Sequence, residues 1–290
     1  MKYLELFEDY INKDFGIFNN SKYIDNMIIL NIDECVEYIL KNCKEFIDKP
    51  VFIKRYISVK MNNSFKATPI ERISRDNANY YTILIDNSEN WKNYPKRSKS
   101  FICSMMYEKY NVNDLKISND NSGSRTELLV IPNDNSIFGI CPADDIYYSF
   151  ERFKIYRYSL AEFFDDMNKL SIFFNLGGIS DDNIDDMKKD IRKLQDQLYN
   201  KANEKYIPYF NLNSFYKFIS DYPGEDIFEL LEKLMSPDIN HFKLQKYTEM
   251  KINSEQVEVW TDSPCIFING EHIEEVLKKL REITHKEINL

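Results

Sequence analysis

The spacing of apolar residues changes twice along this chain, and that change constrains the fold more than any other feature. Alternating, strand-like runs occur before residue 142 and return after residue 241, as in VFIKRYISV and QVEVWT. Between them, residues 159–235 space their apolar side chains as helices do. We therefore predict an α+β fold in which early and late strands share one split sheet, mixed or antiparallel, with a helical insertion over 159–235.

Two amphipathic helices are expected ahead of the first strand. Residues 1–14 and 33–47 place apolar side chains three and four positions apart, and Asp33 stands where the second helix would have its N-cap. A further helix is predicted over 271–284. No repeat or low-complexity linker interrupts the sequence, so we predict a single domain over residues 1–290.

Several classes of protein are disfavoured by what the sequence lacks. No apolar run approaches the roughly 20 residues that span a bilayer, and the start carries acidic residues where a signal peptide is basic and then apolar. The five cysteines are scattered without a Cys-x-x-Cys pair, which predicts neither a disulfide framework nor a zinc cluster. We expect a cytoplasmic protein with reduced thiols and no membrane contact.

Charge and short motifs narrow the function classes further. The net charge of -9 predicts no bulk nonspecific binding of nucleic acid. Neither a Gly-x-Gly-x-x-Gly nor a Gly-Lys-Ser/Thr loop occurs, and the three histidines lack the spacing of metal ligands. Rossmann, P-loop, zinc and histidine-triad chemistries are therefore not expected.

Three strand-like segments, far apart in the chain, carry polar side chains that could meet in one site. Arg55 belongs to the early strand VFIKRYISV, and SKSFICSMM at 98–106 is rich in serine. In the late strand, Gln256 and Glu258 are two positions apart and so point to one face. This layout resembles the Arg-Ser-Glu class of ADP-ribosyltransferases, whose strands supply an Arg, a Ser-rich signature and a Gln/Glu-x-Glu motif.

The resemblance implies a split mixed α/β fold that holds NAD, as a substrate, without a Rossmann loop. It implies that Glu258 stabilises the oxocarbenium-like centre formed when the nicotinamide–ribose bond breaks, and that Gln256 orients the acceptor. Arg55 would hold a pyrophosphate or ribose oxygen, and Ser100 would fix the rotamer of the carboxylate. The remaining implied contacts to NAD are Ser98 and Ser104, and a stacking partner for nicotinamide among Tyr107, Tyr110 and Trp91.

The sequence alone leaves alternatives open for these residues. Glu127 in SRTELLVIP is a second candidate for the catalytic carboxylate, although Arg125 stands where a Gln or Glu is expected. Arg55 has a structural interpretation as a strand arginine paired with a nearby carboxylate. Gln256 and Glu258 have one as charged or polar residues on the solvent face of an edge strand.

A second resemblance covers longer segments of the chain. RISRDNANYYTILIDNSENWKNYPKRSKSFICS and EVWTDSPCIFI resemble a little-characterised group of bacteriophage proteins. This resemblance implies a host protein or nucleic acid as the target, and a place in the host cytoplasm or in the virion. It leaves a noncatalytic alternative, a virion component or an inhibitor that binds a host factor through the aromatic loop around Trp91. A third alternative is a hydrolase that uses Asp144, Asp145 and Glu151.

Overall fold

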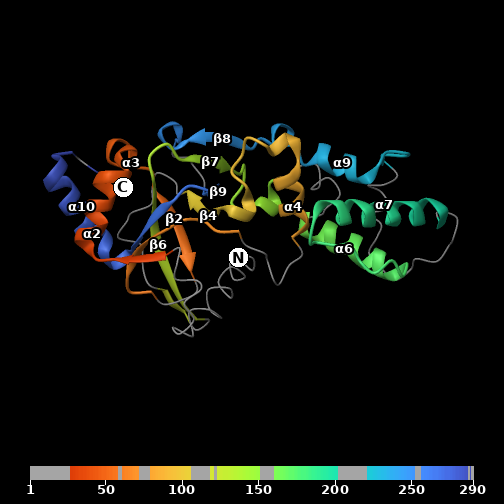
Figure 1. The fold of residues 1–290 in the computed structure, drawn as a ribbon, viewed down its shortest axis with the longest axis horizontal. Helices are drawn as coiled ribbons and strands as arrows, with labels where there is room; N and C mark the ends of the chain where they lie inside the picture. Colours follow the sequence, from red (N-terminus) through yellow and green to blue (C-terminus); the bar gives the residue numbers. More distant parts are fainter. Residues whose placement is uncertain are drawn as a thin grey trace. The chain divides into compact units, whose positions relative to one another are not determined.

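The fold combines helices with one large antiparallel sheet (Figure 1). A computed structural model describes residues 27–57, 61–71, 79–105, 118–120, 123–150, 160–201, 221–251, 256–286 and 288. In these residues the strands are β1 (Met27–Leu30), β2 (Ile53–Ile57), β3 (Ser64–Ala67), β4 (Phe101–Met105), β5 (Ser118–Asp120), β6 (Gly123–Pro132), β7 (Ile137–Ile140), β8 (Lys243–Lys246), β9 (Val257–Thr261) and β10 (Cys265–Asn269).

Late strands are inserted among early ones in the sheet, whose order is β1-β3-β10-β6-β2-β4-β9-β7-β8, with β5 paired to β6. Of the late strands, β9 and β10 each lie between two early ones and pair with them antiparallel. The predicted combination of helices with a sheet drawn from both ends of the chain is therefore confirmed. Its antiparallel pairing fits one of the two predicted arrangements.

Helices lie before and after the main run of strands in the sequence, and in the long segment between the early and late strands. The α-helices in the described residues are α2 (Ile32–Asn42), α3 (Lys44–Asp48), α4 (Tyr80–Asn87), α6 (Leu160–Phe173), α7 (Ile184–Lys201), α9 (Ile227–Leu234) and α10 (Gly270–Thr284). Short 3-10 helices are η2 (Glu89–Trp91), η3 (Arg97–Lys99), η5 (Ile146–Tyr148), η6 (Asp238–Asn240) and η7 (Tyr247–Glu249). Within these residues, no helix combines the length and the apolar character that crossing a bilayer requires.

The start of α2 corrects one prediction. Asn31, not Asp33, is the N-cap: its side chain accepts from the backbone N–H of Glu34, and the Glu34 carboxylate accepts from the Asn31 N–H in return. This capping box satisfies two backbone donors at once, which a cap at Asp33 would leave open. The predicted helix over 33–47 is also two helices, separated at Cys43. The predicted helix over 1–14 lies outside the described residues.

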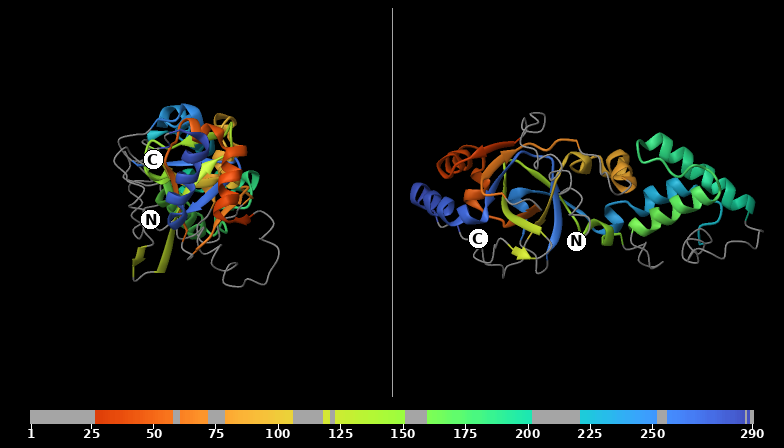
Figure 2. Two further views of the ribbon diagram at one scale, coloured as in Figure 1. Left: turned by 90° about the vertical axis from the view of Figure 1, so that its left-hand side faces the viewer. Right: turned by 90° about the horizontal axis from the view of Figure 1, so that it is seen from below.

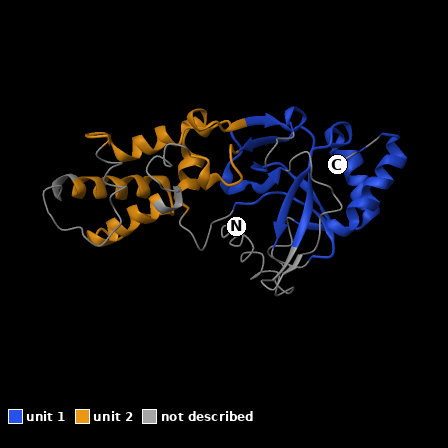
Figure 3. Ribbon diagram, turned by 180° about the vertical axis from the view of Figure 1, so that it is seen from behind, with its two compact units in different colours: residues 1–76, 94–140, 244–290 blue, residues 77–93, 141–243 orange. Residues whose placement is uncertain are grey.

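The chain divides into two compact units, shown in blue and orange in Figure 3. Unit 1 comprises residues 1–76, 94–140 and 244–290 and carries most of the sheet, whereas unit 2 comprises 77–93 and 141–243 and is mainly helical. The expected insertion over 159–235 falls inside unit 2. That the whole chain forms a single domain stays a prediction, because two compact units can belong to one domain or to two.

The core of unit 1 lies between the curled sheet and a pair of helices. Helices α2 and α10 lie side by side and pack against β10, with α10 also against β6 (Figure 1). On the sheet, Phe101 of β4 contacts Phe267 of β10, with ring centroids 4.9 Å apart, although β6 and β2 separate these strands. The sheet therefore curls on itself, as the right-hand view of Figure 2 shows. All five cysteines are buried, and none forms a disulfide.

Unit 2 has its own aromatic core. The ring of Tyr80 on α4 stacks on Phe164 of α6, and its hydroxyl donates to the carbonyl of Ile179. Trp91 packs edge-on against Phe242, with ring centroids 4.8 Å apart. The apolar stripes of α6, α7 and α9 thus find partners within this unit, as their helical spacing predicted.

Candidate functional site

Three neighbouring strands of unit 1 place polar side chains in a row on one face of the sheet. Glu258 on β9 lies directly opposite Ser104 on β4, and Ser104 lies opposite Lys54 on β2. Directly opposed residues of antiparallel strands point to the same face. We call Lys54, Ser104 and Glu258 the polar row. The strands that meet here are the three that the sequence suggested, brought together from far apart in the chain.

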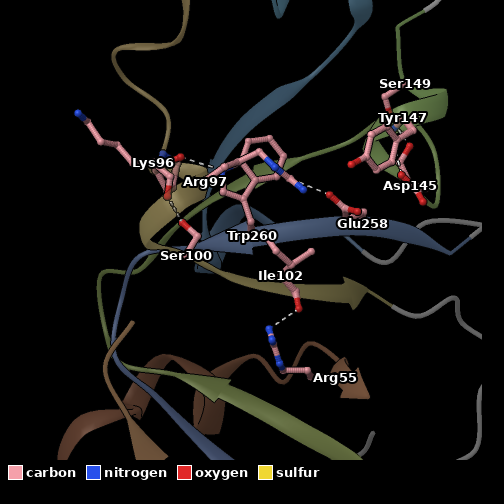
Figure 4. Close-up of polar contacts among 11 residues, drawn as sticks. Arg55, Lys96, Arg97, Ser100, Ile102, Asp145, Tyr147, Ser149, Glu258 and Trp260 are labelled. Carbon is pink, nitrogen blue, oxygen red and sulfur yellow. Dashed lines mark hydrogen bonds and ion pairs between the residues drawn. The ribbon is translucent and has the colours of Figure 1, made fainter. Parts of the chain in front are cut away.

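One end of the polar row is an ion pair. The Arg97 Nη1 atom of η3 donates to Glu258 Oε1 at 2.7 Å (Figure 4). The arginine side chain is 2% exposed and the glutamate side chain 12%. A charge-assisted bond of this length between such buried groups fixes the carboxylate in place, because separating the charges would leave both poorly solvated.

Trp260 supports this ion pair from the same strand. It is two residues beyond Glu258, so both project from one face of β9. The guanidinium carbon of Arg97 lies 5.1 Å from the centroid of the Trp260 ring, and the indole N–H donates to the carbonyl of Pro95 at 2.8 Å. Tyr94 stacks on the same ring at 6.0 Å. The segment that carries Arg97 is thus attached to β9 at several points.

Gly139 makes room for the tryptophan. It lies opposite Trp260 in the pairing of β7 with β9. A Cβ atom at this position would come within 2.2 Å of the indole ring, far inside van der Waals contact. The position is therefore restricted to glycine by the ring that lies over it.

The other end of the polar row is a second buried ion pair. Lys54 Nζ lies 2.7 Å from Glu127 Oε1, with side-chain exposures of 3% and 6%. Lys54 also donates to the hydroxyl of Tyr56, which lies opposite Glu127 in the pairing of β2 with β6. Glu127, the alternative candidate carboxylate, therefore shares the face of Glu258, and a lysine holds it.

Arg55 is not where the sequence placed it. Since neighbouring residues of a strand point to opposite faces, Arg55 leaves the face that Lys54 occupies. Its guanidinium lies 5.9 Å from the ring centroid of Phe101 and donates to the carbonyl of Ile102 at 2.6 Å. Figure 4 shows Arg55 and Glu258 with β4 and β9 between them. The expectation that these two side chains share one pocket is wrong.

The bond from Arg55 has a structural explanation. The register of β2 with β4 consists of Ile53 with Met105 and Lys54 with Ser104, and it does not extend to Ile102. The arginine side chain thus donates to a part-buried carbonyl at a position that the pairing of β2 with β4 does not reach. Arg55 thus supports the sheet from its other face through a bond to a backbone carbonyl.

The serines are also redistributed. Ser100, the expected partner of the carboxylate, donates to the Lys96 carbonyl at 2.7 Å and so closes the turn of η3. Ser104 instead takes the position opposite Glu258. Ser98 is half-buried within η3, and Gln256 is half-buried immediately before β9. The serine that lies beside Glu258 is therefore Ser104, not Ser100.

Trp91 cannot serve as an exposed stacking or docking residue. Its side chain is buried in unit 2, and its indole N–H donates to the Met235 carbonyl at 2.9 Å. Its burial argues against its expected role against nicotinamide, whereas the noncatalytic alternative stays a prediction. Tyr107 and Tyr110 lie outside the described residues, so their expected role stays a prediction.

The hydrolase alternative finds no support in the described part of the chain. Asp145 Oδ1 accepts from the backbone N–H of Tyr147, and its carbonyl accepts from the hydroxyl of Ser149, so this residue caps η5 (Figure 4). Asp144 is exposed, and Glu151 lies outside the described residues. Among the residues that the structure describes, no group of three or more His, Cys, Asp or Glu side chains could hold a metal ion.

The sequence analysis did not assign Arg97, Lys54 or Trp260 to the site. For Lys54, however, the strand pattern indicated which face the side chain would take. In VFIKRYISV, Arg55 alternates onto the side of Val51, Ile53 and Ile57, which is the side that a core would bury. Lys54 therefore had to face the other way. Arg97 stood in a basic cluster of the kind that usually lies in solvent, and nothing in the sequence distinguished it from its neighbours.

The chain was compared with family models, with curated proteins and with solved structures, and none of them matches it.

Proposed function

We propose that this chain is an ADP-ribosyltransferase of phage type that uses NAD to modify a host macromolecule in the host cytoplasm, with Glu258 as its catalytic carboxylate. One observation carries the proposal. Glu258, on β9, is bound by Arg97 and lies directly opposite Ser104 of the Ser-rich strand β4. The resemblance to the Arg-Ser-Glu class requires that neighbourhood of serine and glutamate.

The reaction explains why a fixed carboxylate is useful. Breaking the nicotinamide–ribose bond builds positive charge on the ribose, and an oriented negative group beside it lowers the barrier. Glu258 meets this need because Arg97 restricts its position before any substrate is present. Ser104, on the same face, is placed to hydrogen-bond the carboxylate or a ribose hydroxyl.

The proposal departs from the resemblance at the cation. Arg55 faces away from Glu258, and the cation in the polar row is its neighbour Lys54, which is engaged with Glu127. Of the two candidate carboxylates, Glu258 is the more exposed, with 12% against 6% of the side chain accessible. We therefore assign catalysis to Glu258 and a supporting ion pair to Glu127.

The test is release of nicotinamide from NAD by the full chain, together with transfer of label from adenylate-labelled NAD to the protein and nucleic-acid fractions of a host lysate. Glu258→Gln preserves shape and removes the charge, and we expect a loss of about 100-fold or more in both assays. Glu127→Gln is the matched control, because it makes the same change at the other buried carboxylate of this face.

The control should retain nicotinamide release to within about tenfold, after correction for the folded fraction by circular dichroism. The proposal fails if the native chain neither releases nicotinamide nor transfers label, or if Glu258→Gln matches it. A loss confined to Glu127→Gln would move catalysis to the alternative carboxylate.

A further inference from the structure

The ion pair between Arg97 and Glu258 is surrounded by further contacts that hold Arg97 in place. The guanidinium is bounded on one side by the carboxylate, at 2.7 Å, and on another by the ring of Trp260, at 5.1 Å from its centroid. A planar cation can donate in its plane while an aromatic ring covers its face, which a point charge cannot do as well. The geometry is therefore specific for arginine.

The backbone that carries Arg97 is itself tied to the strand that carries Glu258. Two residues before Arg97, the carbonyl of Pro95 accepts from the Trp260 indole, and Tyr94 stacks on the same ring. Trp260 therefore fixes Arg97 relative to Glu258, because Glu258 and Trp260 project from the same face of β9.

The tryptophan in turn has one permitted position. Its ring lies over Gly139, where a Cβ atom would be 2.2 Å away, and its N–H is committed to Pro95. The ring is completely buried. Each step from β7 through Trp260 and Arg97 to the carboxylate is fixed by packing or by a hydrogen bond, as supports of a preorganised site are.

We infer that Arg97 is a positioning residue which, fixed by Trp260 and Pro95, orients the Glu258 carboxylate toward the positive charge that develops on the ribose as the nicotinamide–ribose bond breaks, an inference that rests on the proposed function. Arg97 acts through Glu258, with its guanidinium engaged by the protein. A displacement of about 1 Å in a catalytic group costs on the order of 100-fold in rate, so a positioning residue of this kind has a large effect without contributing to the reaction directly.

The test compares Arg97→Gln, Arg97→Lys and Lys96→Gln in the full chain. For Arg97→Gln we expect kcat for nicotinamide release to fall by about 100-fold while KM changes little. Arg97→Lys keeps the charge and should recover part of the loss, and guanidinium ions added to Arg97→Ala should restore part of its activity. Lys96→Gln removes a charge from the adjacent exposed residue and should change kcat less than about twofold.

A double-variant cycle separates positioning from direct action on NAD. If Arg97 works through the carboxylate, Arg97→Gln should lower kcat by less than about threefold further when Glu258→Gln is already present. An additive loss, or a rise in KM at constant kcat, would show that Arg97 contacts NAD, and would overturn the inference.

Failure of the proposed function gives a different result. In that case Glu258→Gln leaves nicotinamide release unchanged, whatever Arg97 does. If Glu258→Gln abolishes release and Arg97→Gln has no effect, the proposed function stands and the positioning role is overturned. Thermal unfolding of each variant shows whether the compared chains are folded.

Discussion

The two faces of the central strands β2, β4 and β9 both bury a cation, but they satisfy it in different ways. On one face, Lys54 and Arg97 pair with Glu127 and Glu258. On the other, Arg55 is equally buried and donates to the backbone carbonyl of Ile102. Burial of a charge is thus the same on both faces, whereas the chemical nature of the partner differs.

This difference separates a candidate site from a structural support. A carboxylate held by a cation can stabilise developing charge or bind a hydroxyl group, and both uses depend on its position. The bond from Arg55 to the Ile102 carbonyl instead completes the hydrogen bonding of the sheet. Selecting Arg55 from the strand pattern therefore chose the face away from Glu258.

The largest effect is expected at the ion pair between Lys54 and Glu127. Lys54→Ala leaves a buried carboxylate without its lysine, which should lower the free energy of unfolding by about 3–5 kcal/mol. The double variant Lys54→Met, Glu127→Leu should recover most of this, because an apolar pair needs no charge compensation. Urea unfolding measures both. A cost below about 1 kcal/mol for Lys54→Ala would mean that this pair is effectively solvated.

Gly139→Ala should have the next largest effect. The added methyl group meets a ring that Pro95 and Arg97 hold in place, so we expect a loss of about 3 kcal/mol, at the upper end for overpacking. Because the ring must shift, nicotinamide release by the folded fraction should fall as well. Gly224→Ala, where a Cβ atom would meet nothing within 4 Å, tests the effect of a methyl group without the ring. Its positive φ of 82° adds some backbone strain.

Arg55→Leu tests the comparison of the faces most directly. The leucine keeps apolar packing near Phe101 but removes the donor to the Ile102 carbonyl, so the free energy of unfolding should fall by about 1–2 kcal/mol. Nicotinamide release per folded molecule should stay within about twofold of the native value, because no reacting group lies on that face. A folded Arg55→Leu chain without activity would restore the arginine to the site and end the distinction between the faces.

The strand pattern predicted the sheet better than it predicted the site. Alternation in VFIKRYISV and QVEVWT depends on local sequence, so the strands β2 and β9 were recognisable, whereas their neighbourhood with β4 was expected from the resemblance. Which serine stands opposite Glu258 depends on register, and register is set by contacts along the whole strand pair. A shift of four residues along β4 separates Ser100, which closes a turn, from Ser104, which lies opposite Glu258.

Contacts between residues far apart in the sequence could not be predicted from local sequence patterns. Arg97 pairs with a residue 161 positions away, and Trp91 is buried by Met235 and Phe242 in a unit assembled from separate segments. Neither contact leaves a periodic signal in the sequence near the residue. The basic cluster at 96–99 and the aromatic loop at 91–95 therefore suggested exposed surfaces, whereas Arg97 and Trp91 are both buried.

The smallest expected effect is a dependence of stability on alkaline pH, which belongs to the Arg55 face. Burial, with nearby Cys103 and Cys43, raises the pKa of Cys265 well above its ordinary 9.0, against a smaller lowering by Arg55. The folded chain then keeps a proton that the unfolded chain releases above pH 9, so this contribution to stability is complete below pH 9 and declines as pH rises. In Cys265→Ala, urea unfolding at pH 8 and pH 10 should show a smaller decline than in the native chain. An identical decline would place the titrating groups elsewhere, and the faces would then differ in their charge partners alone.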